Sequence, residues 1–294
     1  MLLKPRASYF RRTCISAMST HSETLDVATA LADVKAKIKD SAERSGSINY
    51  KLPRLVAVSK TKPVEAIMEA YNAGQRVFGE NYVQEIVEKA PKLPLDINWH
   101  FIGHMQSNKV RSVIEAVPNL SMIETIDSIK LADRINRMIG DASTSRGSSP
   151  ESSPKVSPRG STSITKEKES SLAANVKRLD VLIQINTSGE TSKSGVDPGP
   201  SVLSIASHIK NNCPNLRFAG LMTIGMPDDD SDFRVLSRCR DEVAAALQLT
   251  PEESQQLELS MGMSGDYERA IACGSTNVRV GSSIFGARAY PPKS

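Results

Sequence analysis

Eight short apolar segments alternate with eight segments of helical periodicity, and this alternation restricts the fold more than any other feature. Parallel strands need a long crossover connection, which a helix usually provides. We therefore predict a single α/β domain, a TIM (β/α)8 barrel, with a doubly wound open sheet as the alternative. No GxGxxG motif follows the first segment, which argues against a dinucleotide-binding fold. The predicted strands are residues 55–58, 76–81, 98–103, 120–126, 179–185, 218–224, 257–261 and 277–281.

The first predicted helix, residues 25–42, precedes the first strand instead of following one. Its apolar residues recur at three- and four-residue steps, so one face should be buried against the outside or the base of the barrel. The other predicted helices each follow a strand, as a barrel requires. They are residues 64–73, 82–90, 106–117, 128–139, 200–210, 232–247 and 267–273.

Two segments differ in composition from the predicted barrel, which spans residues 25–290. Residues 1–20 are basic, rich in serine and free of acidic residues, which is typical of a mitochondrial transit peptide. Met18 offers an alternative start that would remove most of this extension, and a tail without function is the other interpretation. Residues 141–175 are poor in large apolar side chains, so we predict a disordered insertion on the amino-terminal face of the barrel.

Composition and charge exclude several classes of function. The net charge is only +4, and no basic face interleaved with aromatic residues is evident, so nucleic acid is not expected as a partner. No apolar run reaches the length of a membrane span. The four cysteines form no CxxC pair and the histidines no spaced ligand set, which predicts reduced thiols and no metal. We expect a cytoplasmic or mitochondrial protein.

Lys60 follows the carboxyl end of the first predicted strand. Because side chains alternate along a strand, Lys60 should face the same way as Val56 and Val58. Burial lowers the pKa of a lysine and frees its amine to attack a carbonyl group. The alternative is an ordinary surface lysine beyond the strand end.

Two stretches rich in glycine and serine, residues 260–266 and 279–283, end the last two predicted strands. Barrels often hold phosphate in the loops after strands seven and eight, where backbone N–H groups are free. Each glycine taken singly could be a plain turn. A lysine facing a phosphate pocket suits a phosphorylated carbonyl compound. Pyridoxal 5′-phosphate (PLP) and the substrate of a sugar-phosphate aldolase both meet this description.

Six motifs extend the argument over residues 25–286, interrupted only by the insertion. They are Val58-Ser-Lys-Thr-Lys-Pro63, Phe78-Gly-Glu-Asn-Tyr-Val-Gln-Glu85, Trp99-His-Phe-Ile-Gly-His-Met-Gln-Ser-Asn-Lys109, Gly220-Leu-Met-Thr-Ile224, Ser260-Met-Gly-Met-Ser-Gly-Asp266 and Arg279-Val-Gly-Ser-Ser-Ile-Phe-Gly286. Together they resemble the pyridoxal phosphate homeostasis protein family, also called the YggS or PROSC family. The resemblance implies a barrel of the alanine racemase N-terminal type.

The resemblance also implies that Lys60, not Lys62, holds PLP as an aldimine. Asn81 and Met222 would line the ring of the cofactor, and Arg279 would face its pyridine nitrogen. The phosphate would be held by Ser264, Gly281 and Ser282. His104 lies near the mouth or is a packed structural histidine.

The function implied by the resemblance is PLP binding for intracellular PLP homeostasis, by buffering or delivery, without robust catalysis. PLP-dependent apoenzymes are the candidate recipients, and a monomer is expected. A PLP-dependent racemase or decarboxylase is the alternative, and a phosphosugar aldolase is a third reading. Alanine racemases carry a second domain that closes the site. The chain ends at Ser294, soon after the eighth predicted strand, so we expect the carrier.

Overall fold

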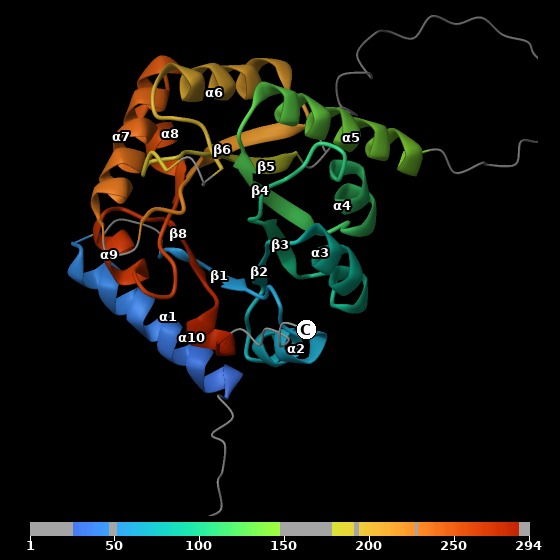
Figure 1. Cartoon of the computed structure of the whole chain (residues 1–294), viewed down its shortest axis with the longest axis vertical. Coiled ribbons are helices and arrows are strands. Elements are labelled where there is room, and N and C mark those ends of the chain that lie inside the picture. The colour runs from blue at the N-terminus through green and yellow to red at the C-terminus, as the bar shows by residue number, and fades with distance from the viewer. Residues whose placement is uncertain (1–25, 47–51, 148–177, 191–193, 227–228, 288–294) are drawn as a thin grey trace, which may run out of the picture.

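The computed structural model describes residues 26–46, 52–147, 178–190, 194–226 and 229–287 (Figure 1). Eight parallel strands follow one another around a closed barrel, and β8 pairs with β1. This closure confirms the predicted barrel and rules out the open sheet. The strands are β1 (Arg54–Val58), β2 (Val77–Glu80), β3 (Asn98–Phe101), β4 (Leu120–Ile126), β5 (Leu179–Gln184), β6 (Leu216–Met222), β7 (Glu258–Ser260) and β8 (Asn277–Val280).

Helices surround the barrel on its outside (Figure 1). Analysis of the sequence missed the short α8, although its start carries a clear signal. Thr250 and Glu253 form a capping box around Pro251, so the first backbone N–H groups of the helix are satisfied. The helices are α1 (Val27–Arg44), α2 (Val64–Asn72), α3 (Val83–Lys89), the 3-10 helix η1 (Ala90–Lys92), α4 (Val110–Ala116), α5 (Ile129–Gly147), α6 (Pro200–Asn212), α7 (Ser231–Ala246), α8 (Pro251–Gln256), α9 (Tyr267–Ala272) and α10 (Ser282–Phe285).

Helix α1 lies on the outside of the barrel, where the first and last strands meet. This is one of the two positions predicted for it, the outside or the base of the barrel. The side chain of Asp26 caps it by accepting hydrogen bonds from the backbone N–H groups of Ala28 and Thr29. Its buried face, which includes Leu31 and Ile38, packs against α2, α9 and α10 (Figure 1). The helix therefore supports the outside of the seam between β1 and β8.

Most of the buried apolar residues that the structure describes belong to one of two separate clusters. The large cluster lies between the strands and the surrounding helices, which is why the strands read as nearly continuous apolar runs. The small cluster contains Met122, Leu182, Ala219 and Met222 and fills part of the barrel interior. Polar residues occupy other parts of that interior, including Glu124, which is fully buried.

The predicted insertion joins α5 to β5, on the amino-terminal face. Its predicted start was wrong: residues 141–147 continue helix α5 to Gly147. The rest of the insertion and the amino-terminal residues 1–20 lie outside the described residues. Within the part of the chain that the structure describes, no helix is long and apolar enough to cross a membrane. Cys213, Cys239 and Cys273 form no disulfide with one another, and Cys14 lies outside the described residues.

Substitution of the single tryptophan tests the outer core. Trp99 is fully buried, and its ring centroid lies 6.0 Å from that of Phe78. Trp99→Ala should lower the free energy of unfolding by about 3–5 kcal/mol, because the cavity cannot fully collapse. Trp99→Phe keeps an aromatic ring and removes an indole N–H that has no partner in the described structure.

The free energy of unfolding of Trp99→Phe should fall by roughly half as much as that of Trp99→Ala, or less. Urea unfolding followed by circular dichroism measures both, since neither variant retains the fluorescent tryptophan. Equal losses in the two variants would contradict a packing role for the ring.

Candidate functional site

A cavity opens at the carboxyl ends of the strands, with a volume of about 320 Å³. This size lies within the range of small-molecule sites. All of the residues that the sequence predicts for a cofactor line this cavity, although they come from five separate loops and strand ends. They are Lys60, Asn81, Met222, Ser264, Arg279, Gly281 and Ser282. The structure thus brings the predicted residues together, and their individual roles remain predictions.

Lys60 lies two residues beyond the end of β1, and it lines the cavity together with Val58. This is the shared orientation that strand alternation predicts. The next residue, Thr61, has a φ of 62°, which is uncommon for a residue with a β-branched side chain. The backbone N–H of Thr61 donates to Glu85 Oε2 at 2.7 Å. This hydrogen bond holds the strained turn that directs Lys60 toward the cavity.

A buried ionic cluster supports the same turn from the other side. The Ser59 hydroxyl donates to Glu80 Oε1 at 2.8 Å, and Lys89 Nζ donates to the same oxygen at 2.8 Å. Lys89 also donates to Glu85 Oε2 at 2.6 Å and to the backbone oxygen of Ser59 at 3.0 Å. Burial raises the pKa of Glu80, and the neighbouring Lys89 ammonium partly offsets this effect. The residues on both sides of Lys60 are therefore anchored.

Sequence reasoning missed this support. Glu85 and Lys89 are four residues apart on one helix, which is a recognised pairing distance. That spacing alone gives no sign that Lys89 reaches back to the loop after β1. Only the pairing of β1 with β2 brings Ser59 beside Glu80.

Asn81 and Met222 line the cavity from the ends of β2 and β6. Met222 belongs to the small apolar cluster and is 1% exposed. Asn81 Oδ1 is buried and has no hydrogen-bond partner in the described structure. The backbone of Asn81 lies very close to Gly103. A Cβ atom added at Gly103 would stand 1.9 Å from the carbonyl oxygen of Asn81. Gly103 is thus required for the position of Asn81.

Residues from the ends of β7 and β8 form the opposite side of the cavity. The backbone N–H of Gly281 donates to Ser264 Oγ at 3.1 Å, which joins the two loops. Ser282 is the first residue of α10 and also lines the cavity. The two predicted glycine- and serine-rich stretches are therefore neighbours, and Ser264 and Ser282 line the same cavity.

Arg279 reaches the floor of the cavity from the barrel interior and is 4% exposed. Its Nη1 donates to Ser260 Oγ at 2.6 Å, and its Nη2 donates to the backbone oxygen of Thr223 at 2.8 Å. Burial lowers the pKa of Arg279, and the negative charges of Glu124 and Asp266 oppose this effect. A guanidinium remains protonated under such conditions, so the cavity floor carries a fixed positive charge.

His104 does not belong to the described lining of the cavity. Its side chain is 52% exposed, and its Nδ1 lies 3.6 Å from Asp127 Oδ2. The alternative of a packed structural histidine is therefore wrong for His104. The buried histidine of the barrel is His100, whose Nδ1 lies 2.6 Å from Glu124 Oε1.

One group of potential metal ligands lies together in the described part of the chain, namely Asp133, His208 and Cys213. His208 Nε2 and Asp133 Oδ1 are 2.7 Å apart, which is a hydrogen-bond distance. Two ligands of one tetrahedral zinc ion would be roughly 3.3 Å apart, given bond lengths of about 2.0–2.1 Å. Burial and the nearby Asp133 raise the pKa of the Cys213 thiol to about 11. These contacts favour a hydrogen-bonded contact between α5 and α6 over a metal site.

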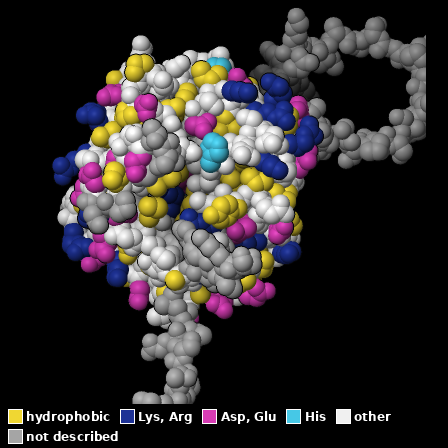
Figure 2. Space-filling view, in the orientation of Figure 1, with side chains coloured by type: hydrophobic (Ala, Val, Ile, Leu, Met, Phe, Trp, Pro, Cys, Tyr) yellow, Lys and Arg dark blue, Asp and Glu magenta, His cyan; other side chains and the backbone are white. Residues whose placement is uncertain are grey.

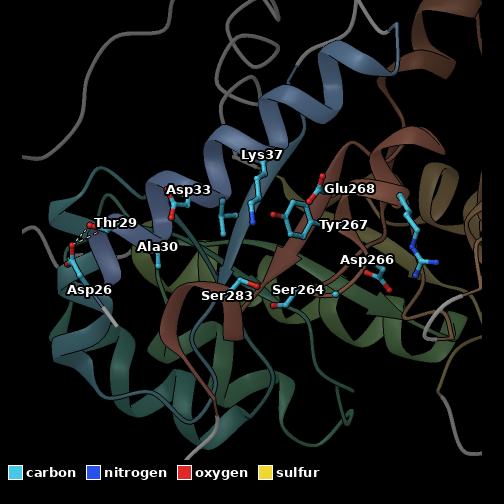
Figure 3. Close-up of a pocket in the computed structure, with 13 residues that line it drawn as sticks. Asp26, Thr29, Ala30, Asp33, Lys37, Ser264, Asp266, Tyr267, Glu268 and Ser283 are labelled. Carbon is cyan, nitrogen blue, oxygen red and sulfur yellow. Dashed lines mark hydrogen bonds between the residues drawn. The ribbon is translucent and has the colours of Figure 1, made fainter. Parts of the chain in front are cut away.

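A larger groove, of about 640 Å³, lies outside the barrel between α1 and α9 (Figure 3). Asp33 and Lys37 line it from α1, and Tyr267 and Glu268 line it from α9. It shares Ser264 with the cavity at the barrel mouth. Size alone would favour this groove, but it lacks a lysine at a strand end and a set of converging donors. The smaller cavity is therefore the candidate functional site.

The surface in view is not dominated by charge of one sign. Figure 2 shows Lys and Arg side chains interspersed with Asp and Glu around the rim, and hydrophobic side chains toward the middle of the face. Such a distribution lacks the basic stripe that nucleic acid requires on this face.

Known proteins share both the fold and much of the sequence. The family described as "Alanine racemase, N-terminal domain" matches residues 160–289. The alanine racemase of Corynebacterium glutamicum has a TM-score of 0.56 at 14% identity, covering 91% of this chain and 63% of that one, which is a likeness of fold alone. The fold and the lysine-bearing cavity thus define a (β/α)8 barrel protein of the alanine racemase N-terminal type.

A closer relationship is found among proteins called pyridoxal phosphate homeostasis protein. The human protein of that name is 45% identical over 92% of this chain and 90% of its own length. PipY of Synechococcus elongatus, solved with PLP bound, is 29% identical with a TM-score of 0.60, covering 88% of this chain and 100% of that one. This chain belongs to the pyridoxal phosphate homeostasis protein family.

The pH dependence of stability tests the ionic cluster behind Lys60. An unfolded glutamate has a pKa of about 4.3, whereas burial raises the pKa of Glu80 in the folded protein. The folded state then binds the Glu80 proton more tightly than the unfolded state does. The stability that this proton contributes is present below about pH 4.3 and is lost as the pH rises through the raised pKa of the folded protein. Relative to wild type, the free energy of unfolding of Glu80→Gln should therefore improve as the pH rises above about 4.3.

Urea unfolding at intervals of pH measures this difference. Glu252→Gln, at an exposed position of α8, controls for the loss of a carboxylate. A difference between Glu80→Gln and wild type that does not change with pH would contradict the assignment.

Proposed function

We propose that this protein binds PLP in the cavity at the carboxyl mouth of the barrel and serves intracellular PLP homeostasis. The observation that carries the proposal is the convergence of the Lys60 amine, the Arg279 guanidinium and the hydroxyl groups of Ser264 and Ser282 on one cavity. The family relationship supports it, since relatives bear the name of this function. PipY, which shares the fold, has been solved with PLP.

The groups that line the cavity fit the groups of the cofactor. PLP has a phosphate, an aldehyde, a ring hydroxyl and a pyridine nitrogen. Ser264 and Ser282 offer hydroxyl donors for the phosphate, and Gly281, whose N–H donates to Ser264 Oγ, holds the Ser264 side chain beside them. Asn81 Oδ1 is a buried acceptor without a partner in the described structure, which a hydroxyl-bearing ligand would satisfy. Arg279 can only donate, so it suits an unprotonated ring nitrogen.

Lys60 is the residue that we propose for covalent attachment. Its Nζ would condense with the aldehyde carbon of PLP, forming a carbon–nitrogen double bond and releasing water. Lys62 lines the same cavity and is the competing candidate. Its Nζ donates to the backbone oxygen of Ala287 at 2.8 Å, and burial lowers the pKa of Lys62. Lys60 is preferred because it shares the inward face of β1 with Val58.

Arg279 gives a reason for weak catalysis. The protonated pyridine ring of PLP supplies the electron sink for carbanion chemistry. A fixed guanidinium at the ring nitrogen opposes protonation of that nitrogen, whereas a carboxylate would favour it. The titratable side chains in the described lining of the cavity are Lys60, Lys62 and Arg279. Racemisation needs acid and base groups on both faces of the substrate, and the described lining offers no carboxyl, imidazole or phenol group for this.

We therefore favour a carrier that buffers PLP or delivers it to PLP-dependent apoenzymes, over a racemase or decarboxylase. The expected location is the cytoplasm or the mitochondrion, and the expected state is a monomer.

Attachment is tested by replacing each lysine singly. Wild-type protein reconstituted with PLP should show the absorbance band of a Schiff base, and borohydride should fix the cofactor mass on a peptide containing Lys60. Lys60→Ala should lose the band, because the attacking amine is gone. Lys62→Ala is the matched control and should keep it. The opposite result would assign the attachment to Lys62.

Turnover tests the carrier against the enzyme. The PLP-loaded protein should racemise or decarboxylate common amino acids far more slowly than about 1 per second, because the described cavity lacks paired acid and base groups. Chiral chromatography of alanine after long incubation measures this rate. Sustained inversion at an ordinary enzymatic rate would support the racemase instead.

A further inference from the structure

A chain of hydrogen-bonded polar side chains crosses the interior of the barrel. Arg279 Nη1 donates to Ser260 Oγ at 2.6 Å, and Ser260 Oγ donates to Glu124 Oε2 at 2.5 Å. The other oxygen, Glu124 Oε1, lies 2.6 Å from His100 Nδ1 and accepts from Asn277 Nδ2 at 3.1 Å. The residues come from β8, β7, β4 and β3, so closure of the barrel is what brings them together.

The two ends of this chain face two different cavities. Arg279 lines the cavity at the carboxyl mouth, where the cofactor is proposed to bind. His100 lines a second cavity of about 420 Å³ among the first residues of the strands, including Arg54 and Asn98. Glu124 lies between them and is fully buried. The polar chain thus spans the barrel from the proposed cofactor site toward its opposite end.

A buried carboxylate in a barrel interior needs a specific reason, since burial of an unpaired charge is very unfavourable. Burial acts to raise the pKa of Glu124, but the hydrogen bond and charge of His100, the charge of Arg279 and the Ser260 hydroxyl outweigh it and hold that pKa below its usual range. Glu124 is therefore an anion. An apolar side chain of similar volume would fill the same space with a smaller desolvation penalty. The charge of Glu124 itself therefore points to a role.

Ser260 connects that anion to the cofactor site in a fixed direction. A hydroxyl has one proton to donate, and Ser260 donates it to Glu124 while accepting from Arg279. The second guanidinium nitrogen, Nη2, is held by the backbone oxygen of Thr223. Hydrogen bonds to Ser260 on β7 and to Thr223, just beyond β6, thus fix the plane of the guanidinium beside the cavity that Arg279 lines.

We propose that Glu124 and Ser260 are positioning residues for the cofactor: they hold the guanidinium of Arg279 at the ring end of the cavity, and the charge of Glu124 sets the electrostatic potential there. This inference rests on the proposed binding of PLP and adds the residues that tune it. The titratable and charged groups that face Arg279 are Glu124 and Asp266, and those that face Glu124 are His100 and Arg279. Lys60 and Lys62 line the same cavity as Arg279.

Glu124→Gln tests the electrostatic part, because it keeps the shape and removes the charge. The ring end becomes more positive, which disfavours the protonated form of the bound cofactor. The midpoint of the pH titration of its absorbance should therefore fall by about one pH unit, the effect of a unit charge at ~10 Å with an effective dielectric constant of ~20. A merely structural glutamate would leave this midpoint unchanged.

Ser260→Ala tests the geometric part, because it keeps the charges and breaks the link between them. PLP affinity, measured by equilibrium dialysis, should fall by about five- to tenfold, since a hydrogen bond to a charged group no longer orients Arg279. Met122→Leu, which changes an apolar residue two positions before Glu124 on β4, is the matched control. It should leave both affinity and midpoint at wild-type values.

The outcomes separate the two proposals. Wild-type protein that takes up no PLP would refute the proposed function. Wild-type protein that binds PLP, with an unshifted midpoint in Glu124→Gln and unchanged affinity in Ser260→Ala, would overturn this inference alone. Circular dichroism checks the fold of each variant. If Glu124→Gln does not fold, the affinity of Ser260→Ala decides the question by itself.

Discussion

Pairing of the first strand with the last is the interaction on which the rest of this structure depends. The parallel ladder of β1 and β8 places Val56 beside Arg279 and Ala57 beside Val280. It follows that Lys60, just beyond β1, and Gly281, just beyond β8, open on one cavity although they are far apart in sequence. Helix α1 packs on the outside of this seam and supports it. A chain with the same eight units in an open sheet would separate the lysine from the glycine- and serine-rich ends.

The barrel interior is filled partly by apolar and partly by polar and charged residues. The small apolar cluster fills one part, and the chain from Arg279 to His100 fills another. Two buried carboxylates respond oppositely to their surroundings: the pKa of Glu80 is raised by burial, whereas hydrogen bonds and positive charges overcome burial and lower that of Glu124. Glu80 supports the turn that carries Lys60, and Glu124 supports the arginine on the cavity floor. Both networks therefore hold side chains or backbone beside the cavity in fixed positions.

These supports agree with the proposal of a protein that binds PLP for homeostasis. The cavity presents a lysine, an arginine and hydroxyl donors, and its described lining adds no carboxyl, imidazole or phenol group. A reactive aldehyde would be captured reversibly by an amine under these conditions, with little assistance for further chemistry. Membership of the pyridoxal phosphate homeostasis protein family agrees with this reading, since the relatives share most of the length of the chain.

The alternation of strands and helices by itself determined a parallel α/β sheet, because each apolar segment must be covered on both faces and each parallel pair needs a crossover. The same alternation fits an open sheet, so only the pairing of β8 with β1 decided the closed barrel. The sequence also determined that the candidate cofactor-binding residues would meet at one end of the barrel. Lys60, Ser264 and Gly281 all follow predicted strands, and the carboxyl ends of barrel strands converge. Only the tertiary structure decided that Lys89 braces the loop before Lys60, and that Glu124 and Ser260 hold Arg279. Those contacts join side chains from strands and helices distant in the chain. Their partners depend on strand register and barrel closure, which local periodicity does not encode.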